Sequence, residues 1–145
     1  MEGNTAMSSD KILAIALALL FATTNYAIGD SGYSIDNVVN SFDESRVKQT
    51  KVGYQYWFVD KSFADGKTLK LSVVKPNAAT HEPHIHEEDE FFFVLEGTAE
   101  FHLDGETRTG GPMTSFYCPS GMKHGIRNVG DTELKYLVIK TYLDE

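Results

Sequence analysis

Residues 81–97, with the sequence HEPHIHEEDEFFFVLEG, combine histidines, acidic residues and three consecutive phenylalanines. His84 and His86 are two positions apart, so in an extended segment both imidazoles point to the same side. Glu90 has the same parity and opens an apolar run, which directs its carboxylate toward the protein interior. A carboxylate there is costly unless it is paired or bound to a cation. Two imidazoles and a carboxylate that converge in this way favour a metal site, whereas a His-x-His pair alone would favour surface loop histidines.

A second segment, PSGMKHGIRN at residues 119–128, adds a further histidine. Pro119 and Gly121 are typical of a turn, and His124 then begins a strand at a position where its ring can face the same interior. The only cysteine, Cys118, excludes an internal disulfide and a cysteine-based zinc site. Any metal ligands must therefore be imidazole and carboxylate groups.

The sequence around these residues predicts a series of β-strands. From Tyr54 onward, short β-prone runs alternate with turn residues such as Asp104-Gly105. About eight strands with turns every 8–12 residues predict an all-β barrel or sandwich. In the run EFFFVLEG both faces are apolar, with Phe92 on one face and Phe91 and Phe93 on the other. We therefore expect this strand to be covered on both sides, by the barrel interior and by an N-terminal strand or a second subunit, which predicts a homodimer.

The two histidine segments resemble the two motifs of the cupin superfamily, G(x5)HxH(x3-4)E(x6)G and G(x5)PxG(x2)H(x3)N. The matching residues are His84, His86, Glu90 and Gly97 in the first motif, and Pro119, Gly121, His124 and Asn128 in the second. The opening glycine of each motif is replaced, by Ala78 and by Met113. Those glycines serve turns, so the departure leaves the metal-ligand positions intact.

The resemblance covers about residues 54–141 and implies a single cupin barrel, that is, a double-stranded β-helix or jelly roll. It also implies one divalent transition metal held by His84, His86, Glu90 and His124, with one or two coordination positions open. The ligand types permit Fe, Mn, Ni, Zn or Cu and do not choose among them.

Other residues near these motifs are candidates for a pocket. Phe92 lies two positions after Glu90 and should line the metal site; some small cupin lyases carry a tyrosine there as a base, and phenylalanine cannot take a proton. Tyr117 and Tyr136 are strand residues that could supply a hydroxyl to the pocket, although core aromatic residues are the plainer interpretation. His81 and the acidic residues 87–89 are expected in solvated loops.

The N-terminal part differs from the rest. Lys11 is followed by the apolar run ILAIALALLFA and then by small polar residues, which predicts a signal peptide cleaved near Ala27. The run is too short for a comfortable membrane span, and a buried N-terminal helix is the alternative. We expect residues 1–27 to be an extension with this signal, 28–50 an irregular arm with a short helix near 35–42, and 51–145 the barrel.

The chain has 145 residues and a net charge of -8, without a basic patch for nucleic acid. Together these features predict a periplasmic or secreted cupin with no stable membrane insertion after cleavage. The expected function is a metal-dependent enzyme acting on a small polar or aromatic molecule, of isomerase, lyase or dioxygenase type. The alternative is a non-catalytic metal-containing module that binds a sugar or another small ligand.

Overall fold

The computed structural model describes residues 32–142, and the chain separates into two compact units, residues 1–38 and 39–145. The predicted signal peptide lies outside the described residues. In the first unit the described part contains α2 (Ile35–Val38), which is shorter than the helix expected near 35–42. Within residues 32–142 no helix is long and apolar enough to cross a membrane.

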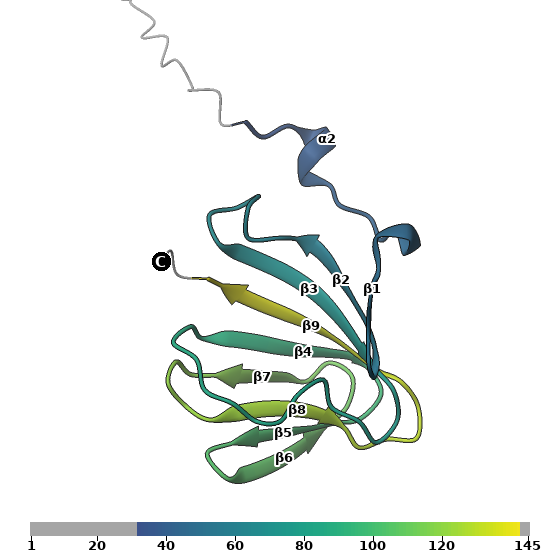
Figure 1. Ribbon diagram of the computed structural model, residues 1–145, viewed down its shortest axis with the longest axis vertical. Helices are drawn as coiled ribbons and strands as arrows, with labels where there is room; N and C mark the ends of the chain where they lie inside the picture. The colour runs from purple at the N-terminus through teal and green to yellow at the C-terminus, as the bar shows by residue number, and fades with distance from the viewer. Residues whose placement is uncertain (1–31, 143–145) are drawn as a thin grey trace, which may run out of the picture. The chain divides into compact units, whose positions relative to one another are not determined.

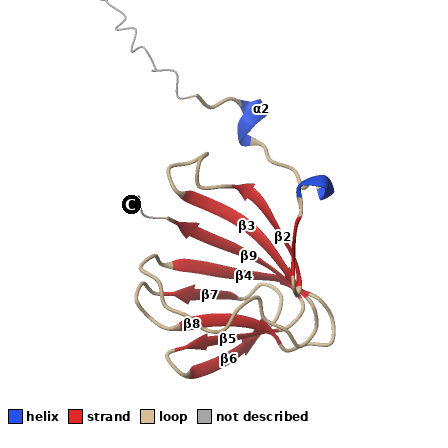
Figure 2. Ribbon diagram, in the orientation of Figure 1, coloured by secondary structure: helices blue, strands red, loops and turns tan. Residues whose placement is uncertain are grey.

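The second unit is built almost entirely of antiparallel strands (Figures 1 and 2). After the short 3-10 helix η1 (Glu44–Arg46), the described strands are β1 (Lys48–Thr50), β2 (Gly53–Val59), β3 (Lys67–Val74), β4 (Glu90–Glu96), β5 (Ala99–Leu103), β6 (Glu106–Gly110), β7 (Ser115–Cys118), β8 (His124–Asn128) and β9 (Leu134–Thr141). They form a six-stranded sheet in the order β1-β2-β3-β9-β4-β7 and a three-stranded sheet in the order β6-β5-β8. The fold is the predicted cupin jelly-roll barrel. Residues 48–50, assigned to the irregular arm, instead form β1 because they pair with β2.

The hydrophobic core lies between the two sheets. Phe92 of β4 packs edge-on against Phe101 of β5, with ring centroids 6.2 Å apart. Phe101 also stacks on Phe116 of β7 at 4.9 Å. Apolar side chains from both sheets are thereby removed from water, which is the main driving force for closing such a barrel.

The two faces of β4 have different environments. Glu90, Phe92 and Val94 point inward and are buried, whereas Phe91 and Leu95 point outward and are 46% and 39% exposed. The second subunit expected over this outer face stays a prediction, whereas the N-terminal strand expected there as the alternative does not cover it within the described residues. The physical reason is that β1 pairs edge to edge with β2 and does not lie over the outer face of β4.

Candidate metal centre

The barrel brings the histidines of the two motifs together through backbone pairing. His84 and His124 form an isolated antiparallel bridge, in which each backbone N–H donates to the other residue's carbonyl at 2.9 Å. The His84–His86 segment is thus held along the edge of β8, and its two histidine side chains turn toward the interior while Ile85 is exposed. Glu90 reaches the same place from the first position of β4 in the other sheet.

The ligand atoms lie at the spacing that a bound metal ion requires. His124 Nε2 is 3.1 Å from His86 Nε2 and 3.0 Å from Glu90 Oε1, and His86 Nε2 is 3.5 Å from Glu90 Oε1. Ligands about 2.1 Å from one metal ion, at angles of about 90–109°, are about 3.0–3.4 Å apart. His84 completes the group, since its ligand atom lies within 4.8 Å of those of His86 and His124.

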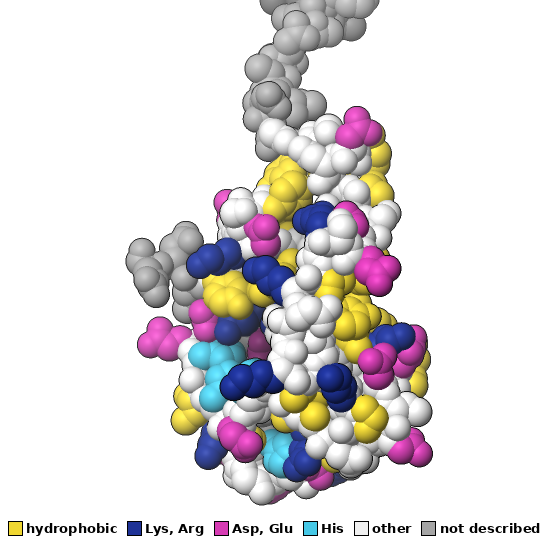
Figure 3. Space-filling model, turned by 45° about the vertical axis from the view of Figure 1, so that its right-hand side comes forward, with side chains coloured by type: hydrophobic (Ala, Val, Ile, Leu, Met, Phe, Trp, Pro, Cys, Tyr) yellow, Lys and Arg dark blue, Asp and Glu magenta, His cyan; other side chains and the backbone are white. Residues whose placement is uncertain are grey.

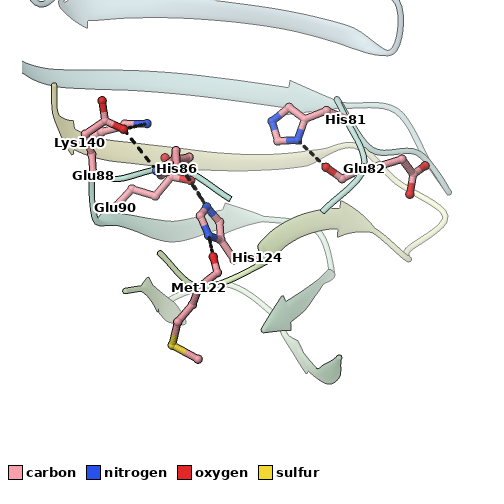
Figure 4. Close-up of polar contacts among 8 residues, drawn as sticks. All are labelled: His81, Glu82, His86, Glu88, Glu90, Met122, His124 and Lys140. Carbon is pink, nitrogen blue, oxygen red and sulfur yellow. Dashed lines mark hydrogen bonds and ion pairs between the residues drawn. The ribbon is translucent and has the colours of Figure 1, made fainter. Parts of the chain in front are cut away.

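A hydrogen bond of His124 indicates which of its ring nitrogens carries the proton (Figure 4). Its Nδ1 donates a hydrogen bond to the Met122 carbonyl at 2.8 Å. A neutral imidazole has one N–H, so Nε2 presents a lone pair to the Glu90 carboxylate and to His86. Such a contact between two acceptors is stabilised by a positive charge, either a proton, which makes His124 and Glu90 an ion pair, or a metal ion. The donor set therefore fits a divalent metal ion, and the fixed Nδ1–H is the kind of outer hydrogen bond that orients metal-bound histidines.

Two more ring nitrogens of the site lack a hydrogen-bond partner. The Nδ1 atoms of His84 and His86 are buried without a hydrogen-bond partner, although His86 Nδ1 lies 3.4 Å from Glu88 Oε2. We regard the His86–Glu88 contact as an electrostatic approach only, because it fails the geometric requirements of a hydrogen bond. Burial and the nearby His81, His124 and His86 rings lower the pKa of His84. The neutral imidazole, which is the form that binds metals, is thereby favoured.

Glu90 lies in an inward-facing row that crosses the sheet. Its cross-strand neighbours are Lys140 on β9 and Cys118 on β7. Lys140 Nζ forms an ion pair with Glu88 at 3.2 Å, so Glu88 is tied to the site rather than solvated as expected. The Cys118 thiol is fully buried within 4.8 Å of the Glu90 and His124 ligand atoms, and burial raises the pKa of this thiol. The neutral thiol is therefore the favoured form beside the four ligand residues.

A small cavity opens beside the ligand residues. Its volume is about 140 Å³, and its wall includes Trp57, Lys70, Thr80, Phe92, Tyr136 and Lys140. Figure 3 shows histidine side chains beside basic and acidic ones on one face of the molecule. Burial raises the pKa of Tyr136 to about 12, so its hydroxyl stays protonated and can donate a hydrogen bond at neutral pH. Phe92 and Tyr136, two of the pocket candidates, line this cavity.

Tyr117 does not line this cavity, and its prediction as a pocket residue is wrong. Its side chain is 48% exposed on the outer face of the sheet, beside the Phe91 ring at a centroid distance of 4.8 Å. The hydroxyl donates to Asp89 at 3.2 Å. The reason is strand parity, since β7 directs Phe116 and Cys118 inward and therefore Tyr117 outward.

The sequence reasoning also missed residues of the cavity wall. Trp57, Lys70 and Lys140 stand on β2, β3 and β9, outside both motifs. For Lys70, the only signal in the sequence was the alternation of Lys70 and Ser72 with leucines. This alternation shows that Lys70 and Ser72 share one face of the strand, but it does not show that this face lies inside the barrel. His81, expected in a solvated loop, is exposed, yet its ring lies 4.3 Å from that of His84 at the rim of the cavity.

The second motif also contains a structural residue. Asn128 is completely buried, and its amide donates to the carbonyls of Val74 at 2.9 Å and Thr132 at 2.7 Å. Its own oxygen accepts a hydrogen bond from the backbone of Gly130 at 2.9 Å. Asn128 therefore links β8 to β3 and to the turn before β9, and it does not contact the metal ligands.

Comparison with known proteins agrees with the fold and the motifs. The family model "Cupin domain" matches residues 70–140. A polyketide synthase CurC of Streptomyces cyaneus is 35% identical over 67 residues, which is 46% of this chain and 44% of that protein. The chain therefore spans less than half the length of this relative.

Solved structures show the same barrel. A predicted oxalate decarboxylase from Thermotoga maritima has a TM-score of 0.61 at 20% identity, over 71% of this chain and 99% of that one. The polyketide cyclase RemF from Streptomyces resistomycificus has a TM-score of 0.60 at 23% identity, over 74% of this chain and 88% of that one. A barrel with imidazole and carboxylate ligands at one end defines a cupin fold with a possible metal site. The chain belongs to the cupin superfamily.

Proposed function

We propose that this cupin is a metal-dependent enzyme that binds one divalent transition metal through His84, His86, Glu90 and His124 and acts on a small molecule. The observation that carries the proposal is the convergence of three imidazoles and one carboxylate, with His124 Nε2 lying 3.0 Å from Glu90 Oε1 in a buried position. A binding cavity adjoins these groups, as an open metal site requires. The similarity to a polyketide cyclase and to a predicted oxalate decarboxylase supports enzymatic chemistry on a small substrate.

The size and lining of the cavity restrict the substrate. A volume of about 140 Å³ is well below the roughly 300–1,000 Å³ of sites for drug-sized ligands. When bound, the metal would polarise an oxygen of the substrate as a Lewis acid. The Tyr136 hydroxyl is a hydrogen-bond donor on the wall, while Phe92 excludes water without exchanging protons. These roles suit isomerase, lyase or dioxygenase chemistry, and the metal, Fe, Mn, Ni, Zn or Cu, would select among them.

The proposal is tested by elemental analysis of protein purified without added metal, followed by turnover assays on a panel of small substrates. We expect one metal ion per chain in the wild type. Glu90→Gln keeps the shape of the side chain and removes its charge, so metal affinity should fall by at least the ~10–100-fold that loss of an outer partner costs. The matched control is Glu87→Gln, because Glu87 is exposed. Unchanged metal content in Glu90→Gln would contradict the assignment.

The alternative is a non-catalytic module that binds a sugar or another small ligand. It is favoured by the absence, among the described cavity residues, of an acid or base committed to proton transfer apart from the ligand set. Wild-type protein that holds metal and binds a ligand from the panel, while turning none over, would select this alternative.

We also propose export to the periplasm or the medium, on the basis of Lys11 and the apolar run that follows it. Expression of the full chain should give a mature product that begins near residue 28 outside the cytoplasm. A version that lacks residues 1–27 is the control and should remain inside. An uncleaved full chain in the cytoplasm would contradict the proposal.

A further inference from the structure

Lys70 has an unusual position for a lysine. It lies in the middle of β3 and points into the barrel, between Trp57 of β2 and Val138 of β9. Its ammonium group lies 5.0 Å from the centre of the Trp57 ring. The side chain is half-buried, and burial lowers its pKa. A cation in this environment costs free energy unless a partner compensates it.

Within residues 32–142 no carboxylate forms an ion pair with Lys70, and Glu90 acts on its pKa only through its charge, against the effects of burial and of Lys140. Among the described ion pairs, Lys140 is matched with Glu88 at 3.2 Å and Lys135 with Glu96 at 2.8 Å, whereas Lys70 has neither an ion pair nor a hydrogen bond. The indole face of Trp57 offers only a cation–π contact, which leaves the three N–H groups of Lys70 available. A ligand that displaces solvent from the cavity would supply such a partner.

The charges of the cavity wall favour an anion. Glu90 is assigned to the metal, and the charge of Lys140 is balanced by Glu88. Lys70 therefore adds an uncompensated positive charge to that of the divalent ion. A small, partly enclosed cavity with this excess attracts a negatively charged ligand more strongly than open water would allow.

We propose that Lys70 binds the carboxylate of a small acid whose second oxygen reaches the metal centre. The inference rests on the proposed metal-dependent function, because it assigns the substrate class of that site. Its substrates are compact hydroxy or oxo acids, since about 140 Å³ must hold the whole molecule. The apolar part of the ligand would contact Phe92 and Trp57, and the Tyr136 hydroxyl would donate to an uncharged oxygen.

The test compares pairs of small ligands that differ in one carboxylate. Lactate is paired with propane-1,2-diol, and pyruvate with hydroxyacetone, each titrated calorimetrically into the metal-loaded full chain. We expect the wild type to prefer each acid to its uncharged counterpart by at least about tenfold in Kd. Lys70→Met should lose most of this preference, keep its metal content and retain an equal or higher Tm, because a desolvated cation is removed.

Lys67→Met is the matched control, since Lys67 lies on the same strand and is exposed. It should leave the preference unchanged. Lys70→Gln provides a second uncharged variant if the methionine variant folds poorly. A metal-loaded wild type that binds no acid in the millimolar range, or an acid preference that Lys70→Met and Lys70→Gln both retain, would overturn the inference. A wild type that prefers acids without holding metal would contradict the proposed function and leave the role of Lys70 in place.

Discussion

At the scale of single residues, one backbone carbonyl determines the chemistry of the site. The Met122 carbonyl fixes the proton of His124 on Nδ1, at 2.8 Å, and so turns the Nε2 lone pair toward Glu90 and His86. The ring is completely buried, so it cannot find a water molecule to satisfy this lone pair. The Met122 carbonyl belongs to the loop before β8. Its hydrogen bond with Nδ1 therefore orients the imidazole toward a cation even when no ligand is bound.

His84 provides a pH-dependent prediction. Its pKa is lowered from 6.5 in the folded protein, first by burial and then by neighbouring histidines. Between that lowered pKa and 6.5 the unfolded chain binds more protons at this position, so the free energy of unfolding falls as the pH falls through this range. We expect metal-free protein to lose stability in denaturant titrations as the pH falls below 6.5 toward the lowered pKa of His84.

The variant His84→Asn should reduce this pH dependence in the presence of a chelator. His102→Asn is the control, because His102 lies outside the site and is paired with Glu100 at 3.0 Å. If the pH slopes of wild type and His84→Asn coincide, the environment of His84 does not have the assigned effect.

At the scale of elements, the turn after β4 holds the strand that carries Glu90. Gly97 ends this strand with φ +85, and a Cβ atom there would lie 2.5 Å from the Glu133 carbonyl oxygen. Its backbone therefore packs directly on the segment that leads into β9. The motif glycine is needed for its positive φ and also for this close approach of two backbones.

A pair of substitutions separates these two requirements. Gly105 has φ +90, but a Cβ atom there would have no neighbour within 4 Å, so Gly105→Ala carries only the conformational cost of about 1–2 kcal/mol. Gly97→Ala should cost about 1–3 kcal/mol more, because the new methyl group overlaps backbone atoms. Urea denaturation measures both. Equal losses of stability would show that the contact with Glu133 relaxes freely.

At the scale of the whole molecule, an apolar row is exposed on the outer face of the six-stranded sheet. Phe91 pairs directly with Tyr117 on one side and with Ile139 on the other, and the three side chains are 46–48% exposed. Such a row in the middle of a sheet is typical of an interface. The homodimer that the sequence predicts stays a prediction, and this face is where a second copy would pack.

Light scattering tests that prediction. The wild type should have twice the mass of one chain at micromolar concentration, and Phe91→Glu should shift it to the monomer because a charge cannot be buried there without a partner. Thr107→Glu on β6 is a control at an exposed position of the other sheet. A wild-type mass equal to one chain would contradict the dimer.

The sequence by itself determined the fold class and the residues with metal-ligand chemistry. Short β-prone runs with regular turns predicted the all-β barrel, and this prediction is confirmed. The spacing of His84, His86, Glu90 and His124 was sufficient to select the group that the structure brings together. Local spacing works for His84 and His86 because side chains two positions apart in an extended segment share one side. Glu90 joins them because the chain bends at residues 87–88 and enters β4 of the other sheet.

Only the tertiary structure decided which faces lie inside. On β3, Lys70 and Ser72 point into the barrel, while Leu69 and Leu71 lie on the outer face; on β7 the same rule turns Tyr117 outward. A period of two tells which residues share a face, but the choice of the inner face depends on distant strands that pack against it. No local pattern of the sequence therefore predicts that Lys70 lines the cavity. Its position there follows only from the packing of β2, β3 and β9 around the metal ligands.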